Sequence, residues 1–176
     1  RALPRLVATA LLEKSRVALA VGRIETAAAQ IAEAAAQPFW PTPVFRGSFG
    51  SDLENPDTGL ARLELFRGAT GAIAPLEAQI RLAESQVRVR RSLKLRGLLA
   101  QALWLSGQRR PALGELQKAL ADAEPEGLVR VLADEPWVLQ DMLASLPTER
   151  GAFARRVAEA CGPSLATRST RDEPDG

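Results

Sequence analysis

Apolar and small side chains recur every three or four residues along most of the chain. From Ala8 onward they occupy positions 8, 11, 12, 15, 18, 19 and 22, which is the spacing of one face of an α-helix. The glycine at position 22 favours the end of a helix. A second set with the same spacing runs from Ile24 to Ala35. The pattern therefore predicts two helices joined by a short turn, a helical hairpin.

The same layout recurs further along the chain. One helix is expected to end at Gly107 and the next to begin near Pro111, since a proline in the first turn of a helix costs little. The apolar face of that second helix comprises Ala112, Leu116, Ala119, Leu120 and Ala123. Residues 72–83 carry an equivalent face, although Pro75 leaves the start of that helix open; the face comprises Ala72, Leu76, Ile80 and Ala83.

Matching positions in these segments indicate a repeat. Small residues stand 45 and 40 residues apart at Ala27, Ala72 and Ala112. Larger apolar residues keep the same intervals at Ile31, Leu76 and Leu116. Helix pairs repeated in this way predict an all-α fold, a tetratricopeptide-like α-solenoid in which antiparallel helix pairs form a right-handed superhelix. An irregular helical bundle with accidental similarity is the alternative.

Some segments fall outside the repeat. Residues 37–59 are rich in proline and glycine, which predicts a long connection whose aromatic side chains pack onto the helices, namely Phe39, Trp40, Phe45 and Phe49. Two short helices are expected near the end of the chain, one carrying Leu139 to Leu146 and the other Phe153 to Ala160. Residues 162–176 are polar and predict a disordered linker.

Composition narrows the class of protein. Apolar residues form 46% and charged residues 25% of the chain, as in ordinary globular proteins, and the net charge of +2 is too small to indicate nucleic-acid binding. No run of about 18 uninterrupted apolar residues exists, so no membrane span is expected. Cys161 is the single cysteine, which excludes an internal disulfide and fits a reducing, cytoplasmic compartment. Because the chain starts with Arg1 inside an expected helix, we interpret it as a fragment of a longer protein.

The sequence offers little for catalysis. It contains no histidine and no tyrosine, so Cys161 has no histidine to activate it. A Glu-x-x-His pattern for binding a metal is absent for the same reason. Residues 46–51 include two glycines but lack the lysine of a phosphate-binding loop, and a surface loop is expected there. We therefore expect no enzyme activity, no metal and no cofactor.

A stripe of polar and aromatic residues on one helix is the best candidate for a binding site. Its spacing places on one face Arg90, Lys94, Gly97, Gln101 and Trp104. The repeat intervals bring two residues of earlier helices to equivalent places, Arg16 and Glu64. On the concave side of a solenoid this face suits a small polar or anionic ligand, because tryptophan stacks and arginine donates forked hydrogen bonds. The alternative is that the charged residues face water and that Trp104 belongs to the core.

The stripe lies in a basic segment, residues 87–96. Its cationic residues are spread around the helix rather than along one side: Arg88, Arg90, Arg91, Lys94 and Arg96. Neither a helix-turn-helix pattern nor an aromatic stacking platform accompanies them. We therefore do not expect this fragment to bind DNA directly.

Residues 124–135 form the most specific motif of the chain. Glu124-Pro125-Glu126-Gly127 follows an expected helix, and a short apolar segment with a central Arg130 then leads to Asp134-Glu135. Pro125 is placed to stop the helix and Gly127 to provide the turn. The segment that follows is expected to cap the end of the core, with Arg130 pairing with Asp134 or Glu135.

With the preceding Gly107-Gln108-Arg109 and the helix from Ala112 to Ala123, this motif resembles the tetratricopeptide-like sensor region of the MalT-like activators, which are large LuxR-type bacterial regulators. The resemblance covers about residues 60–146. It departs from the family at Leu132 and Ala133, where bulkier or aromatic residues are usual, and at Pro136, where glycine is usual.

The resemblance implies a function. Members of this family carry an ATPase module before the sensor region and a helix-turn-helix DNA-binding domain at the C-terminus. The solenoid between them receives an inducer or an inhibitory protein and couples its binding to oligomerisation and transcription. This chain lacks the phosphate-binding motif of the ATPase. On this interpretation residues 1–161 are the sensor domain, and residues 162–176 are the linker toward a DNA-binding domain that is absent here.

The expected partners follow from the same resemblance. They are a small-molecule inducer or a regulatory protein, with possible self-association, and DNA only through the absent domain. A membrane is not expected to be a partner. The alternative is a plain scaffold for protein–protein interactions that binds no small molecule. An enclosed pocket with convergent polar groups is typical of a sensor, and an open apolar groove is typical of a scaffold.

Overall fold

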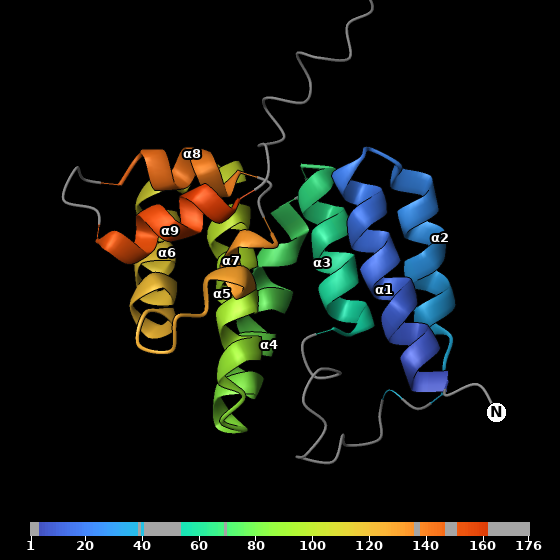
Figure 1. Cartoon of the computed structure of the whole chain (residues 1–176). Coiled ribbons are helices and arrows are strands. Elements are labelled where there is room, and N and C mark those ends of the chain that lie inside the picture. The colour runs from blue at the N-terminus through green and yellow to red at the C-terminus, as the bar shows by residue number, and fades with distance from the viewer. Residues whose placement is uncertain are drawn as a thin grey trace, which may run out of the picture. The chain divides into compact units, whose positions relative to one another are not determined.

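The computed structural model describes residues 4–38, 40, 54–68, 70–135, 138–146 and 151–161. Throughout these ranges the secondary structure is helical, without a strand (Figure 1). The prediction of an all-α fold is confirmed for this part of the chain. The chain divides into two compact units, residues 1–68 and residues 69–176.

The described residues of the first unit form three helices: α1 (Pro4–Ala20), α2 (Ile24–Ala35) and α3 (Pro56–Phe66) (Figure 1). The predicted hairpin is α1 with α2, and the inner residues of α2 are Ala27, Ile31 and Ala34, all buried. Helix α3 packs against both. It approaches them closely at Gly59, where a Cβ atom would lie 3.2 Å from side-chain atoms of Ile31 and Leu12.

The start of α3 corrects one predicted boundary. The long connection was expected to reach residue 59, but the helix begins at Pro56. Asn55 caps it, because its side-chain oxygen accepts hydrogen bonds from the backbone N–H and the hydroxyl of Thr58, both at 2.8 Å. Asn-Pro before a helix is a recognisable start signal, since proline is favoured at the first helical position.

One aromatic residue of the connection is described. The indole N–H of Trp40 donates a hydrogen bond of 2.6 Å to the carbonyl oxygen of Ala34, which confirms that Trp40 packs at the end of α2. The predictions for Phe39, Phe45 and Phe49, and for the linker at residues 162–176, lie outside the described residues.

Where the structure describes the second unit, it has a short 3-10 turn (Thr70–Ala72) followed by six α-helices: α4 (Ile73–Ser85), α5 (Val89–Leu105), α6 (Arg109–Ala123), α7 (Val129–Ala133), α8 (Leu139–Ala144) and α9 (Ala152–Ala160). The predicted inner faces of residues 72–83 and 112–123 are buried throughout. Because α4 starts at Ile73, Pro75 lies in its first turn, where a missing N–H leaves no intrahelical bond unmade. Helix α5 is central and contacts α4, α6, α7 and α8.

The same turn joins successive helices at four places. Its central residue has a positive φ: 76° at Gly22, 56° at Val87, 82° at Gly107 and 63° at Gly127. In each turn the next residue donates its backbone N–H to the carbonyl oxygen five positions back, at 2.9 to 3.1 Å. This bond belongs to the Schellman motif, which satisfies the carbonyl groups at a helix end. In the second unit the turn recurs every 20 residues, at positions 87, 107 and 127.

Candidate functional site

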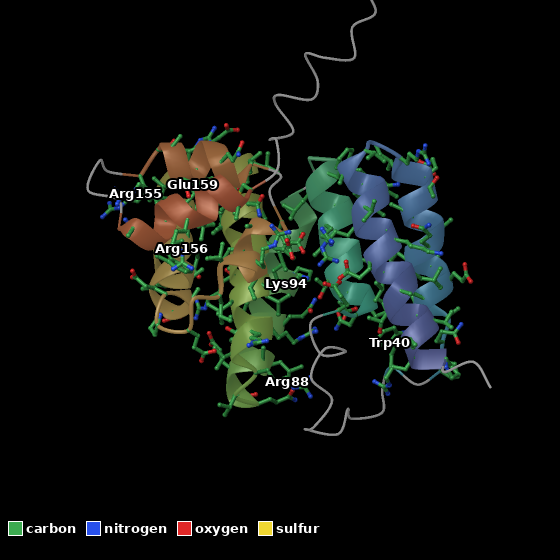
Figure 2. All side chains as sticks on the ribbon, in the orientation of Figure 1. Trp40, Arg88, Lys94, Arg155, Arg156 and Glu159 are labelled. Carbon is green, nitrogen blue, oxygen red and sulfur yellow. The ribbon has the colours of Figure 1, made fainter. Side chains whose placement is uncertain are left out.

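The predicted stripe on α5 contains both exposed and buried side chains. Arg90 is exposed in the first turn of the helix, and Trp104 is half-buried near its end. Between them, Lys94 retains only 7% of its surface exposed and Gln101 retains none. Figure 2 shows Lys94 on α5, further along the helix than Arg88, which directly precedes its first residue. The middle of the stripe therefore lies in the interior.

Gln101 is bound at both ends of its amide group. Its Nε2 donates a hydrogen bond of 2.9 Å to the carbonyl oxygen of Glu135, and its Oε1 accepts one of 3.0 Å from the backbone N–H of Val138. These two backbone groups flank the connection between α7 and α8. A buried backbone N–H or carbonyl without a partner is costly, so a single side chain here stabilises the path of the chain.

A buried ion pair lies beside this amide. Lys94 Nζ is 3.4 Å from Glu135 Oε1, and Glu135 is only 1% exposed. Next to both, a Cβ atom on Gly97 would lie 3.2 Å from a methyl group of Leu132, so α7 packs closely on α5. Lys94 and Gln101 thus bind Glu135 of the same chain, and Gly97 allows α7 to pack closely on α5.

These contacts correct the expectation of an open concave groove. The face that carries Lys94, Gly97 and Gln101 is covered by α7 and by the residues that follow it. The three residues lie on one face of α5, as the spacing predicted. The spacing gave no indication of Glu135 as the partner of Lys94 and Gln101, because Glu135 follows the short helix α7, more than 30 residues further along the chain.

The two ends of the stripe differ from its middle. The guanidinium carbon of Arg109 lies 3.7 Å from the centre of the Trp104 ring. This cation–π contact joins the end of α5 to the start of α6. Trp104 is therefore neither a plain core residue nor an unoccupied stacking platform. Arg90 is the one member of the α5 stripe that is exposed.

The remaining predicted site residues belong to the first unit. Arg16 on α1 pairs with Glu13, one turn earlier, with 2.9 Å between Nε and Oε2. Glu64 is half-buried on α3. Within the second unit the structure brings Lys94 and Gln101 together at Glu135, whereas Arg16 and Glu64 are described only within their own unit.

The Glu-Pro-Glu-Gly motif adopts the predicted structure. Helix α6 ends at Ala123, Pro125 lies in the turn that follows, and Gly127 has a φ of 63°. Arg130 forms an ion pair with Asp134, as expected. Arg130 also donates a hydrogen bond of 3.3 Å to the carbonyl oxygen of Ala160, which connects α7 to the end of α9.

Most of the basic cluster on α5 is paired with neighbouring helices. Arg91 donates a hydrogen bond of 3.0 Å to the side chain of Gln79 on α4. Arg96 pairs with Glu84 on α4 and, at 2.7 Å, with Glu115 on α6. These contacts stabilise the packing of α4, α5 and α6, and they give Arg91 and Arg96 a structural role within the helical unit.

The pKa values in this network follow from pairing. Burial alone would raise the pKa of Glu115, but hydrogen bonds and charges from Lys118 and Arg96 outweigh burial and lower it. Burial alone would lower the pKa of Arg96, but Glu84 and Glu115 together raise it. The ionised forms of Glu115 and Arg96 are therefore stabilised in this network.

The thiol of Cys161 lies at the end of α9. Burial raises its pKa to about 11; Arg130 opposes this rise and Asp134 adds to it. The thiolate is the nucleophilic form, so this cysteine is mostly protonated and unreactive near neutral pH. The described side chains contain no group of three or more metal-binding residues. Among the described helices, none is long and apolar enough to cross a membrane.

Comparison of the chain with protein-family models, with curated proteins and with solved structures gave no match. Function is therefore inferred from the fold and from the contacts described above.

Proposed function

We propose that the chain is a tetratricopeptide-like helical-repeat domain that senses an effector in a cytoplasmic bacterial transcription activator of the MalT-like class. The effector is a small-molecule inducer or a regulatory protein. Its binding would be coupled to self-association and transcription, with DNA contacted only by a separate domain. The right-handed superhelical arrangement of the helix pairs belongs to the same proposal.

The repeated turn is the observation that supports this proposal best. A left-handed residue and the same hydrogen bond recur at positions 87, 107 and 127. Successive helices separated by the same turn at a constant interval are typical of solenoid proteins, whose extended surfaces serve as binding surfaces. The motif that resembles the MalT-like family, residues 124–135, includes the third of these turns.

The contacts of Glu135 supply a mechanism for the proposal. Lys94 and Gln101 hold the segment after α7 against the central helix of the unit. An effector that changes the packing of α5 would therefore also change the position of α8 and α9. The size of such a shift is limited by the difference between the affinities of the effector for the two states.

A second candidate function is a scaffold that binds a protein partner and no small molecule. One observation favours it: the polar side chains Lys94 and Gln101, which were expected to recognise a ligand, already bind the chain itself. The accessible part of the stripe is then limited to Arg90 and part of Trp104.

Thermal unfolding of the chain in the presence of small polar and anionic metabolites separates the two candidates. A ligand that binds only the folded state raises the melting temperature, and the increase grows with the logarithm of ligand concentration above the dissociation constant. For a sensor, at least one metabolite is expected to produce such a concentration-dependent increase, and Trp104→Ala is expected to abolish it.

Trp104→Phe is the matched control, because it retains an aromatic ring for Arg109 while removing the indole N–H. An increase that survives Trp104→Ala would contradict a ligand site on the stripe. If no metabolite changes the melting temperature, and a protein partner co-purifies with the chain, a small-molecule inducer is contradicted, and the chain either senses a protein effector or serves as a scaffold.

A further inference from the structure

Exposed apolar side chains gather at the turn that joins α4 to α5. Leu82 near the end of α4, Val87 in the turn and Val89 at the start of α5 remain 57%, 82% and 45% exposed. Arg81 and Arg90, which flank this segment, are also exposed. We call these five residues the basic tip. An exposed apolar patch bordered by charged residues is typical of an interaction surface.

The backbone at the centre of the basic tip is strained. Val87 has a φ of 56°, whereas glycine stands at the equivalent place in the turns at positions 22, 107 and 127. The valine side chain gains little from packing, because it is 82% exposed. Backbone strain that packing does not explain is concentrated at functional sites. The strain is therefore an independent indication that the side chain of Val87 contacts a partner.

A second exposed turn of the same unit has the opposite charge. Glu124 and Glu126 are exposed in the turn that follows α6, and Asp122 is exposed near the end of that helix. We call these three carboxylates the acidic tip. Between them Pro125 is also exposed. The acidic tip therefore offers carboxylates around an apolar ring, which is complementary to the basic tip.

Both tips lie at the same end of the second unit. Arg96 on α5 pairs with Glu115 on α6, across the turn at Gly107, so the two helices lie side by side and run in opposite directions. Helix α6 consequently ends near the start of α5, at the lower end of the unit in Figure 1. Axes of packed helices are about 8 to 10 Å apart. One surface therefore contains both the basic tip and the acidic tip.

The charges of the two tips are available to another molecule. Within the described part of the chain, neither arginine of the basic tip and no carboxylate of the acidic tip has a side-chain hydrogen bond or an ion pair. Opposite charges close to the tips are already bound, Glu84 by Arg96 and Arg130 by Asp134. Each tip therefore keeps its own sign of charge.

From these observations we propose that two copies of the chain bind each other through this end of the second unit. The basic tip of each copy faces the acidic tip of the other, so a two-fold axis forms both contacts at once, as a self-complementary interface requires. Val87 and Leu82 then face Pro125 of the second copy. This inference rests on the proposed function, in which effector binding is coupled to self-association, and it names the surface that associates.

Sedimentation equilibrium of the whole chain measures this association. We expect a monomer–dimer equilibrium whose dissociation constant rises at least tenfold from about 20 mM to about 500 mM NaCl, because salt screens exposed charges. Arg90→Glu and Glu124→Arg each place like charges in both contacts of the dimer. Each variant alone is expected to raise the dissociation constant at least tenfold at low salt.

An equimolar mixture of these two variants is the decisive measurement. In a mixed dimer each contact again pairs opposite charges, so the mixture is expected to form dimers about as tightly as the unmodified chain. Arg110→Glu is the matched control, because it makes the same change of charge at an exposed position at the start of α6, the other end of the unit. It should leave the dissociation constant unchanged.

Val87→Gly tests the apolar part of the surface without removing a charge. It is expected to weaken association about threefold while the helical content, measured by circular dichroism, stays the same. An unmodified chain that remains monomeric at low salt would overturn the proposal. Dimers that survive both charge reversals, or variants whose mixture stays monomeric, would overturn it as well. None of these results concerns effector binding, which the thermal unfolding measurements test separately.

Discussion

Val87 has a backbone conformation that is unfavourable for its side chain. It has a φ of 56° and is 82% exposed, and it fills the place that glycine fills in the equivalent turns at positions 22, 107 and 127. A β-branched residue is strained in the left-handed region because its Cβ atom crowds the backbone. No side-chain packing compensates for this strain at so exposed a position.

Val87→Gly is therefore expected to increase the free energy of unfolding by about 1 kcal/mol, the strain removed exceeding the added flexibility of the unfolded chain. Chemical denaturation monitored by circular dichroism measures this change. The reciprocal substitution Gly107→Val, in the same turn 20 residues later, should lower the free energy of unfolding by a similar amount. If both substitutions change stability in the same direction, the two turns are not equivalent.

At the scale of elements, α5 organises the second unit. Arg96 connects it to Glu84 on α4 and to Glu115 on α6, and Lys94 and Gln101 connect it to the segment after α7. Long polar side chains thus stabilise contacts with two neighbouring helices and with the segment after α7. Small residues on the facing helices, such as Ala83 and Ala112, allow close packing between these polar contacts.

Stability should depend on pH through Glu115. Its pKa in the folded chain is lower than in the unfolded chain, so its contribution is complete above the unfolded pKa and is lost as pH falls through the folded pKa. Glu115→Gln is expected to lower the free energy of unfolding by about 0.5 to 1 kcal/mol at pH 7, as for a partly exposed ion pair. The difference between the two proteins should disappear in the acidic range, where the carboxylate is protonated.

Urea unfolding at a series of pH values from 7 down to 3 measures this dependence. Glu126→Gln is the control, since Glu126 is exposed in the turn after α6 and its removal should change stability little at any pH. A difference between the Glu115→Gln variant and the original chain that stays constant with pH would contradict the role assigned to the Glu115 carboxylate.

At the scale of the molecule, each of the two compact units contains its own buried ion pair. In the first unit Arg62, fully buried on α3, donates two hydrogen bonds to the carboxylate of Glu54, at 2.6 and 2.7 Å. In the second unit Lys94 pairs with Glu135. A buried pair is strongly destabilising when only one partner is removed, because the other charge is left in the interior.

Arg62→Met is expected to destabilise the first unit by about 3 to 5 kcal/mol, since Glu54 would remain buried without its main partner. Hydrogen exchange measured by mass spectrometry should show faster exchange in α1, α2 and α3, with smaller changes in α4 to α6. Replacing both residues with apolar ones, Glu54→Leu with Arg62→Met, should recover most of the loss. Equal increases in exchange across both units would contradict their description as separate compact units.

The helices themselves were predictable because a helix depends on neighbours in sequence. The faces built from Ala27, Ile31 and Ala34 and from Ala112 to Ala123 are buried as their spacing predicted. Gly22, Gly107 and Gly127 mark turns because glycine accepts a positive φ without strain. The turn at Val87 lacked this signal, and the start of α3 was placed four residues late although Asn55-Pro56 marks it.

The candidate site was less predictable, and the reason is physical. Periodicity shows which residues share a face of a helix, but it does not show what covers that face. Lys94 and Gln101 were correctly placed together on α5, and their open groove was the wrong interpretation, because Glu135 and Val138 come from a distant segment. The burial of Arg62 against Glu54 likewise had no signal in the spacing of apolar residues.

The sequence by itself therefore determined the helical class, most helix boundaries, the glycine turns and the inner faces of the helices. These properties arise from backbone preferences and from a period of 3.6 residues, both of which are local. Only the tertiary structure decided which polar side chains become buried partners and which apolar side chains stay exposed. Those outcomes depend on contacts between residues far apart in the chain, whose free energies are set by burial and geometry in the folded state.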